Sequence, residues 1–273
     1  MSINQDTTLN AVIGYPLKHS LSPALHNVMY EHMGLNTVML AFEQESVEKL
    51  KHFIEAMRYM RIELCAVTSP WKQQVMDFLD DIDMSAKELG SVNTIIQRDG
   101  KLLGYNTDLL GISATLQHVD IQSKKVLILG AGAMAQVIAF YIKKRGGEIF
   151  FHSRTEEKAL ALAEKFSGKI FHFAGAKHPA IQIIINTTPV GMFPHHNDSP
   201  LPEKFLSATQ VVFDLIYNPK ETVLLKSARI KGAQTLSGLD PLIAQAKAQV
   251  RLWCGQDPPD LDYKKFLCTL LNE

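Results

Sequence analysis

Apolar residues recur at two different spacings along this chain, and the spacing changes from one short segment to the next. Val47, Leu50, Ile54 and Met57 stand three or four positions apart, as residues on one face of a helix do. Shorter runs rich in β-branched residues lie between such pieces and favour strands. In the first hundred residues the pattern predicts helices at Pro23–Met33 and around Val47–Met57, and strands at Asn10–Gly14, Thr37–Phe42, Ile62–Thr68, Val92–Ile96 and Lys101–Leu103.

Turn and cap residues mark where these elements begin and end. Ser22 is placed as the N-cap of the first helix, with Pro23 in its first turn and Gly34 just past its end. Asp99-Gly100 is a tight-turn signal between two strands. The first half is therefore expected to alternate strands and helices.

A second alternation begins at Lys125 and continues to the last long helix. Its predicted strands are Val126–Leu129, Glu148–His152, Ile181–Ile185 and Val211–Asp214, and its predicted helices are Met134–Lys144 and Glu156–Phe166. Leu239, Leu242, Ile243, Ala246, Val250 and Trp253 then form the apolar face of a long helix. Alternating strands and helices favour parallel sheets with right-handed crossovers. We expect an α/β protein of two domains with a cleft between them: residues 1–104 completed by 239–273, and residues 105–238.

Composition and charge limit the classes of function. The 273 residues are 46% hydrophobic and carry 28 basic and 28 acidic side chains, so the formal net charge is zero. This balance argues against a general nucleic-acid or membrane-surface binder. Cys65, Cys254 and Cys268 form no CxxC pair, and the His195-His196 pair has no further metal ligands nearby, so we expect no metal site. The sequence has no apolar stretch long enough to cross a membrane, and a reduced, cytoplasmic protein is expected.

A glycine-rich motif follows the first strand of the second alternation. The residues that fit GxGxxA are Gly130, Ala131, Gly132, Ala133, Met134 and Ala135. In this setting the first glycine permits a tight turn, the second admits a pyrophosphate, and the helix N-terminus supplies free N–H groups. A small-residue turn without a ligand is the alternative. The motif stands between a predicted strand and a predicted helix, and this position favours a dinucleotide-binding site.

The end of the next strand indicates which dinucleotide. An NAD site usually has an acidic residue here to bind the ribose hydroxyls. This chain instead has Ser153, Arg154 and Thr155, with Lys158 one turn further, although Glu156 and Glu157 weaken the positive field. Guanidinium, hydroxyl and ammonium groups suit a 2′-phosphate. The sequence therefore favours NADP(H).

Polar clusters in the first half follow predicted strands. In the first cluster, Ser20 and Ser22 are two positions apart and could present hydroxyls to a carboxylate, while Ser22 could instead be occupied as the helix cap. In the others, Lys72 follows a strand and a proline, and Asp108 stands where a helix begins. Taken singly, these could be a surface lysine and a helix-capping acid.

Taken together, the motifs resemble those of the shikimate dehydrogenase family. The first half has HSLSP at residues 19–23, VTSPWK at 67–72, VNT at 92–94 and NTD at 106–108. The second half has the glycine motif, SRT at 153–155, NTTPVGM at 186–192, DLIYNP at 214–219 and LIAQA at 242–246. The resemblance runs from about Val12 to Gly255. It implies a substrate-binding domain with a mostly parallel sheet and a Rossmann-type domain that binds NADP.

The resemblance also implies a role for each matching residue. Lys72 and Asp108 would be the catalytic pair. Substrate would be held by Ser20, Ser22, Thr68, Asn93, Gln245 and Tyr217. NADP would be held by Gly130, Ala131, Gly132, Ala133, Met134, Ala135, Ser153, Arg154, Thr155, Lys158, Thr187, Gly191, Met192 and Gly238. The implied reaction is the reversible reduction of 3-dehydroshikimate to shikimate in chorismate and aromatic amino acid biosynthesis, by a monomer or homodimer.

The chain departs from the family pattern at a few positions. The family commonly has asparagine where Ala66 stands, a glycine where Leu109 stands and an asparagine where Ser153 stands. Ala66 removes a polar side chain from the expected substrate wall. A quinate/shikimate dehydrogenase, or a paralogue acting on a related ring hydroxy acid, is therefore an open alternative. A non-catalytic NADP-binding regulator is a second, which Lys72 and Asp108 argue against.

Overall fold

The computed structural model describes residues 3–174, 178–194 and 196–271, which divide into two compact units. The first unit comprises the described residues up to Leu110 together with Ile243–Tyr263. The second comprises Gly111–Leu242 and the described residues from Lys264 onward. Helices α4 (Asp108–Leu116) and α8 (Leu239–Cys254) each contain a boundary between units. The domain limits drawn from the sequence stay a prediction.

The first unit is built on a six-stranded mixed sheet in the order β2-β1-β3-β5-β6-β4. Its strands are β1 (Thr8–Gly14), β2 (Thr37–Glu43), β3 (Ile62–Val67), β4 (Asp81–Ile82), β5 (Thr94–Arg98) and β6 (Lys101–Tyr105). β1 is parallel to β2 and β3, and β4 is parallel to β6, while β5 is antiparallel to both of its neighbours. Arg98 pairs with Lys101, so the predicted turn at Asp99-Gly100 closes a two-residue hairpin.

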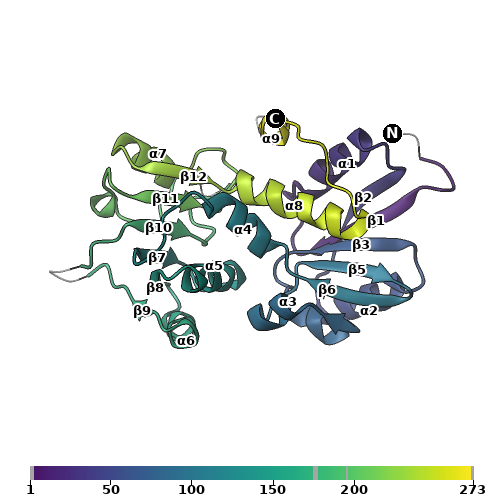
Figure 1. Ribbon diagram of the computed structural model, residues 1–273, viewed down its shortest axis with the longest axis horizontal. Helices are drawn as coiled ribbons and strands as arrows, with labels where there is room; N and C mark the ends of the chain where they lie inside the picture. The colour runs from purple at the N-terminus through teal and green to yellow at the C-terminus, as the bar shows by residue number, and fades with distance from the viewer. Residues whose placement is uncertain (1–2, 175–177, 195, 272–273) are drawn as a thin grey trace. The chain divides into compact units, whose positions relative to one another are not determined.

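Helices cover both faces of this sheet, and the alternation along β1 explains why. Ala11 and Ile13 pack in one core cluster with α2 (Val47–Met57). Asn10 points to the opposite face, where its Nδ2 donates to the Tyr30 hydroxyl of α1 (Ser22–His32) at 3.0 Å. Figure 1 shows α1 and the end of α8 on one face, with α2 and the short α3 (Met84–Leu89) on the other. The polar clusters that follow β1, β3 and β6 are therefore held at the ends of strands whose side chains are buried between helices.

The second unit contains a fully parallel sheet in the order β12-β11-β10-β7-β8-β9. Its strands are β7 (Lys125–Leu129), β8 (Glu148–His152), β9 (Lys169–Ile170), β10 (Ile183–Asn186), β11 (Val211–Asp214) and β12 (Gln234–Ser237). Numbered within the unit, this is the 3-2-1-4-5-6 order of a doubly wound nucleotide-binding fold. The strand order reverses between β7 and β10, and ligands of such sheets bind at the carboxyl ends of the strands there.

The two helices that the sequence predicts between the strands of the second unit are present, and a third was not predicted. α5 (Ala133–Lys144) and α6 (Glu156–Phe166) pack along β7, β8 and β9, and α7 (Val223–Ile230) packs along β11 and β12 (Figure 1). The two-domain α/β class, with one mostly parallel and one Rossmann-type sheet, is thus confirmed. Patterning did not identify the short elements β4, β9, β12, α3, α7 and α9 (Tyr263–Leu270), nor the 3-10 turns Gln74–Phe78 and Glu203–Phe205.

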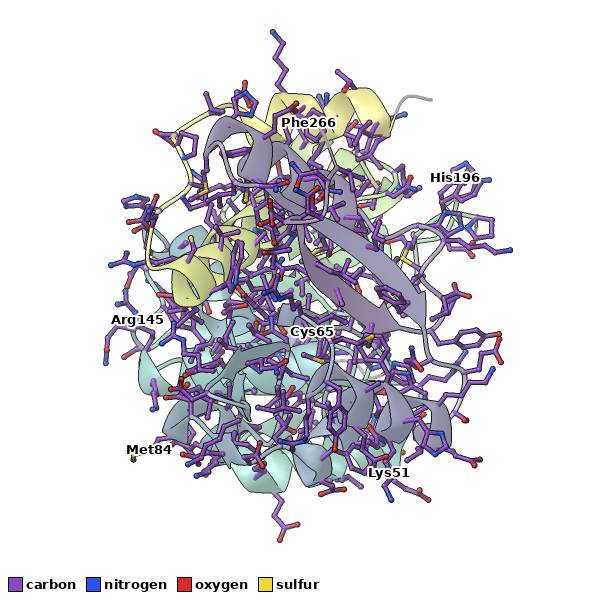
Figure 2. All side chains as sticks on the ribbon, turned by 90° about the vertical axis from the view of Figure 1, so that its right-hand side faces the viewer. Lys51, Cys65, Met84, Arg145, His196 and Phe266 are labelled. Carbon is purple, nitrogen blue, oxygen red and sulfur yellow. The ribbon has the colours of Figure 1, made fainter. Side chains whose placement is uncertain are left out.

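The three cysteines are free thiols. Cys65 is fully buried in β3, and Figure 2 shows it in the interior. Met84, by contrast, is 84% exposed and lies at the periphery in the same view. Burial raises the pKa of the Cys65 thiol. No helix among the described residues is long and apolar enough to span a bilayer.

Candidate active site

Lys72 and Asp108 form a buried ion pair in the first unit. Lys72 Nζ lies 2.7 Å from Asp108 Oδ2, and each residue is 8% exposed. Lys72 stands in the turn after β3, where its carbonyl accepts a hydrogen bond from Val92 N at 2.8 Å. Asp108 is the first residue of α4, whose N-terminus favours a negative charge. The fold therefore joins the ends of two predicted motifs in one charged pair.

Asn93 is fixed beside this pair by a dense set of hydrogen bonds. Its Oδ1 accepts from Thr94 Oγ1 at 2.8 Å and from Thr107 N at 2.7 Å. Thr107 directly precedes Asp108, so the bond also holds the start of α4. Asn93 is 2% exposed. The predicted substrate residue Asn93 is thus linked to the predicted catalytic residue Asp108 by a hydrogen bond to the backbone of the preceding residue.

The two predicted carboxylate-binding serines lie at the start of α1, and one expectation about them is wrong. The helix begins at Ser22 with Leu21 as its N-cap, and no side chain caps it. Ser22 is therefore helical, and its hydroxyl is not used as the cap. Ser20 Oγ accepts from Ser22 N at 3.4 Å, which holds the two residues together. Both serines are half-buried, an exposure compatible with a ligand.

The remaining predicted substrate residues are distributed over both units. Thr68 follows β3, and its N–H donates to Ile13 O at 2.8 Å, so it is held at the end of β1. Gln245 lies in the part of α8 that belongs to the first unit and is 9% exposed. Tyr217 follows β11 in the second unit, and burial raises the pKa of its phenol.

The glycine motif forms the turn between β7 and α5. Gly130 has φ +112°, and a Cβ there would collide with the Thr187 hydroxyl. Thr187 in turn donates its hydroxyl to Leu129 O at 2.7 Å, which fixes the turn after β10 against the end of β7. Gly132 is the N-cap of α5, without a side chain to occupy the first N–H groups. This is the geometry of a helix N-terminus that can receive a pyrophosphate.

The predicted phosphate-binding residues follow β8. Ser153 Oγ accepts from Thr155 N at 3.2 Å, and Thr155 is the N-cap of α6. Arg154 and Lys158 are exposed, and neither forms an ion pair within the described part of the chain. Glu156 lies 4.0 Å from His172 instead. Two positive charges are therefore left available beside the end of β8, where a 2′-phosphate would be expected.

The last group of predicted cofactor residues lies after β10 and β12. Met192 N donates to Pro189 O at 3.0 Å, which forms the turn that contains Gly191. Met192 is 45% exposed. Gly238 lies between β12 and α8, and its N–H donates to Ile216 O at 3.4 Å. Ala131, Ala133, Met134 and Ala135 lie in the turn after β7 and the first turns of α5.

Sequence reasoning gave no role to a buried carboxylate in the second unit. Asp214 ends β11 and accepts from Thr222 Oγ1 at 2.7 Å, Ile216 N at 3.1 Å and Asn186 Nδ2 at 3.0 Å. Burial, the largest effect, raises the pKa of Asp214 to about 6. Asn186 Oδ1 then holds Thr188 N at 2.9 Å. Asp214 and Asn186 both stand in motifs that carried the resemblance. The motifs could therefore have pointed to them, but not to their role in holding the turns after β10 and β11.

Metal chemistry has no candidate centre in the described residues. No three histidine, cysteine or acidic side chains among them gather as metal ligands do. His195, half of the histidine pair considered from the sequence, lies outside the described residues.

Two family models match this chain, one in each half. The shikimate dehydrogenase substrate binding domain matches residues 12–95. The shikimate / quinate 5-dehydrogenase model matches residues 113–188. The second range includes the glycine motif and the residues after β8.

Relatives match over nearly the whole length. Shikimate dehydrogenase (NADP(+)) of Carboxydothermus hydrogenoformans is 39% identical and aligns over 98% of this chain and 99% of its own. A crystal structure of shikimate dehydrogenase in complex with NADP+ is 38% identical, with a TM-score of 0.86 over 94% of this chain and 93% of its own. The ligand-free 5-ketofructose reductase of Gluconobacter sp. strain CHM43 is 30% identical, with a TM-score of 0.85 over 98% and 99%. The resemblance inferred from the motifs is confirmed.

Proposed function

The chain belongs to the shikimate dehydrogenase family, and we propose that it catalyses the reversible NADP-dependent reduction of 3-dehydroshikimate to shikimate. This is a step of chorismate and aromatic amino acid biosynthesis. The observation that carries the proposal is the buried Lys72–Asp108 pair, at 2.7 Å, in the half of the chain that matches the substrate-binding model.

The proposed roles follow from the chemistry of ketone reduction. When bound, NADPH supplies the hydride. Negative charge then develops on the carbonyl oxygen, where the Lys72 ammonium stabilises it and provides the proton. Asp108 accepts a hydrogen bond from Lys72 Nζ and so directs the ammonium. Ser20 and Ser22 are proposed to hold the carboxylate, and Thr68, Asn93, Gln245 and Tyr217 the ring oxygens.

The second unit fits NADP by the chemistry of its donors. Gly130 makes the tight turn against Thr187, and Gly132, the N-cap of α5, faces open space where a pyrophosphate could approach the first N–H groups. Arg154 and Lys158 supply positive charge after β8, and no acidic residue follows β8 at the position where an NAD site would have one. Thr187, Gly191, Met192 and Gly238 are proposed to line the nicotinamide side of the site.

A second candidate is a dehydrogenase for a related hydroxylated substrate. Two observations favour keeping it: Ala66 stands at the end of β3 without a polar side chain, and a full-length structural relative is a 5-ketofructose reductase. A non-catalytic regulator is disfavoured, because a buried lysine–aspartate pair is costly to maintain without a use.

The test is a set of initial rates for the purified chain with shikimate and with quinate, each with NADP and with NAD. We expect shikimate with NADP to give the highest kcat/KM. Higher kcat/KM with quinate would support the second candidate, and no oxidation of either acid would overturn both ring-acid proposals. Gel filtration of the same sample would test the expected monomer or homodimer. The cytoplasmic location stays a prediction.

A further inference from the structure

A buried glutamine that the proposed mechanism does not use lies behind the substrate residues. Gln249 is on α8 and is 1% exposed. Its Nε2 donates to Thr94 Oγ1 at 2.9 Å and to Asn93 O at 3.2 Å. The Asn93 carbonyl already accepts from Val67 N at 2.8 Å. The Asn93 carbonyl would therefore have a hydrogen-bond donor without Gln249. The role of Gln249 is to be sought in its contact with the Thr94 hydroxyl.

The contact with Thr94 lies one hydrogen bond away from the Asn93 amide. Because Thr94 Oγ1 accepts from Gln249, its own proton is directed to Asn93 Oδ1 at 2.8 Å. Asn93 Oδ1 also accepts from Thr107 N at 2.7 Å, so both of its lone pairs are used. Asn93 Nδ2 donates to no group in the described part of the chain. Toward a ligand, Asn93 can therefore only donate.

His26, on α1, holds the serine turn by a separate contact. This ring is fully buried, and its Nδ1 donates to Ser22 O at 2.8 Å. His26 Nε2 and Gln249 Oε1 have no hydrogen-bond partner among the described residues. The hydrogen bonds of Gln249 therefore go to Thr94 and Asn93.

We propose that Gln249 is a positioning residue for the substrate: through Thr94 it turns the Asn93 amide so that Nδ2 meets a hydrogen-bond-accepting oxygen of the substrate. The proposal rests on the function proposed above. It adds that the ring oxygen opposite Asn93 accepts a hydrogen bond and keeps its own proton, if it has one, for another partner. A donor held in one orientation loses less freedom on binding than an amide that can turn.

The experiment compares five variants with the unaltered chain. Gln249→Met keeps the side-chain length, Thr94→Val keeps the shape, and Thr94→Ser restores the hydroxyl. Asn93→Asp replaces the donor by an acceptor, and Asn93→Ala removes the amide. We expect Gln249→Met and Thr94→Val to raise the KM for shikimate about fivefold or more, the worth of one well-placed hydrogen bond. The KM for NADP should stay within about twofold, because the proposed coenzyme residues lie in the other unit. Thr94→Ser should restore most of the loss, and Asn93→Asp should bind substrate no better than Asn93→Ala.

Three results would overturn the proposal: a native KM for shikimate in Gln249→Met, a Thr94→Ser enzyme as impaired as Thr94→Val, or an Asn93→Asp enzyme that binds like the unaltered one. If Gln249→Met does not fold, the Thr94 pair and the Asn93 pair still decide. If the unaltered chain oxidises quinate and not shikimate, the proposed function fails first. The same KM comparison is then made with quinate, which keeps the two failures distinct.

Discussion

Lys72 and Asp108 lie 36 positions apart in the chain, yet their side chains meet at 2.7 Å with only 11% and 10% of their side-chain surface exposed. Two hydrogen bonds hold their backbones in place: Val92 N to Lys72 O, and Thr107 N to Asn93 Oδ1. Since the pair is buried, removing one partner leaves the other charge without compensation. The two residues should therefore behave as one unit in catalysis.

Replacement of either member of the pair should lower turnover. We expect Lys72→Ala to reduce kcat by roughly 10²–10⁴-fold, the usual worth of a positioned acid or base. Asp108→Asn should also reduce kcat, and the double variant should lose less than the product of the two single losses. Steady-state kinetics with shikimate and NADP measures all three values. The KM for NADP should change little.

An exposed ion pair of the first unit provides the matched control. Lys87 Nζ lies 3.0 Å from Asp81 Oδ1, but their side chains are 55% and 69% exposed. Lys87→Ala and Asp81→Asn should leave kcat near the unaltered value. A Lys72→Ala enzyme with turnover like that of Lys87→Ala would remove Lys72 from the mechanism.

The coenzyme preference should depend on Arg154. This arginine is exposed after β8 and forms no ion pair in the described residues, so its charge is available to a 2′-phosphate. Arg154→Asp should raise the KM for NADP by roughly tenfold or more. The difference in kcat/KM between NADP and NAD should become smaller. Arg145→Asp, at the exposed C-terminal end of α5, is the control and should leave the preference intact. Equal use of NADP and NAD by the unaltered chain would contradict the prediction.

Regular elements were the part of the fold that the sequence predicted best. β8, α6 and β11 have the predicted bounds, because periodic apolar positions coincide there with clear end signals. The two-residue strands β4 and β9 were missed, since two residues show no period. They exist through pairing with β6 and β8, which depends on tertiary structure.

Motifs predicted the residues of the candidate site, but not residues whose role depends on contacts between distant segments. Lys72 and Asp108 stand in motifs, so their roles could be expected, and the structure adds the distance between them. The role of Ser22 as N-cap was wrong, because Leu21 takes that position when Ser20 holds the Ser22 amide. Gln249 could not be identified, since its significance lies in contacts with β5 residues about 155 positions away.

Ala66 should influence which ring acid is preferred. It pairs directly with Thr94 across β3 and β5, so the two side chains share the face on which Thr94 contacts Gln249. An amide at residue 66 would add a polar group to that face. Ala66→Asn should therefore change the ratio of shikimate to quinate kcat/KM by several-fold.

Cys65 offers a control one residue away. Its side chain belongs to the core cluster on the opposite face, with α2, so Cys65→Ala should leave the ratio unchanged. An unchanged ratio in Ala66→Asn, together with a substrate-bound structure in which residue 66 is remote from the ring, would contradict the prediction.

His26 should make the free energy of unfolding depend on pH in the acid range. Burial lowers its pKa from 6.5 to about 4, although the carbonyl of Ser22 and the amide of Gln249 act in the opposite direction. The folded state therefore favours the neutral ring. Its contribution is fully present above the unfolded pKa, near 6.5, and is lost as the pH falls toward 4. Between about pH 7.5 and about pH 5 the loss should be about 2 kcal/mol.

Urea unfolding at a series of pH values measures this loss, and His26→Asn should remove most of it while lowering stability at neutral pH. His32 is the matched control. It lies on the same helix, and its Nδ1 makes the same contact with a carbonyl four residues earlier, Val28 O at 2.8 Å, but it is exposed. His32→Asn should therefore unfold with the pH dependence of the unaltered chain. If His26→Asn also keeps that dependence, the acid sensitivity arises from other groups, and His26 is not the residue whose burial sets it.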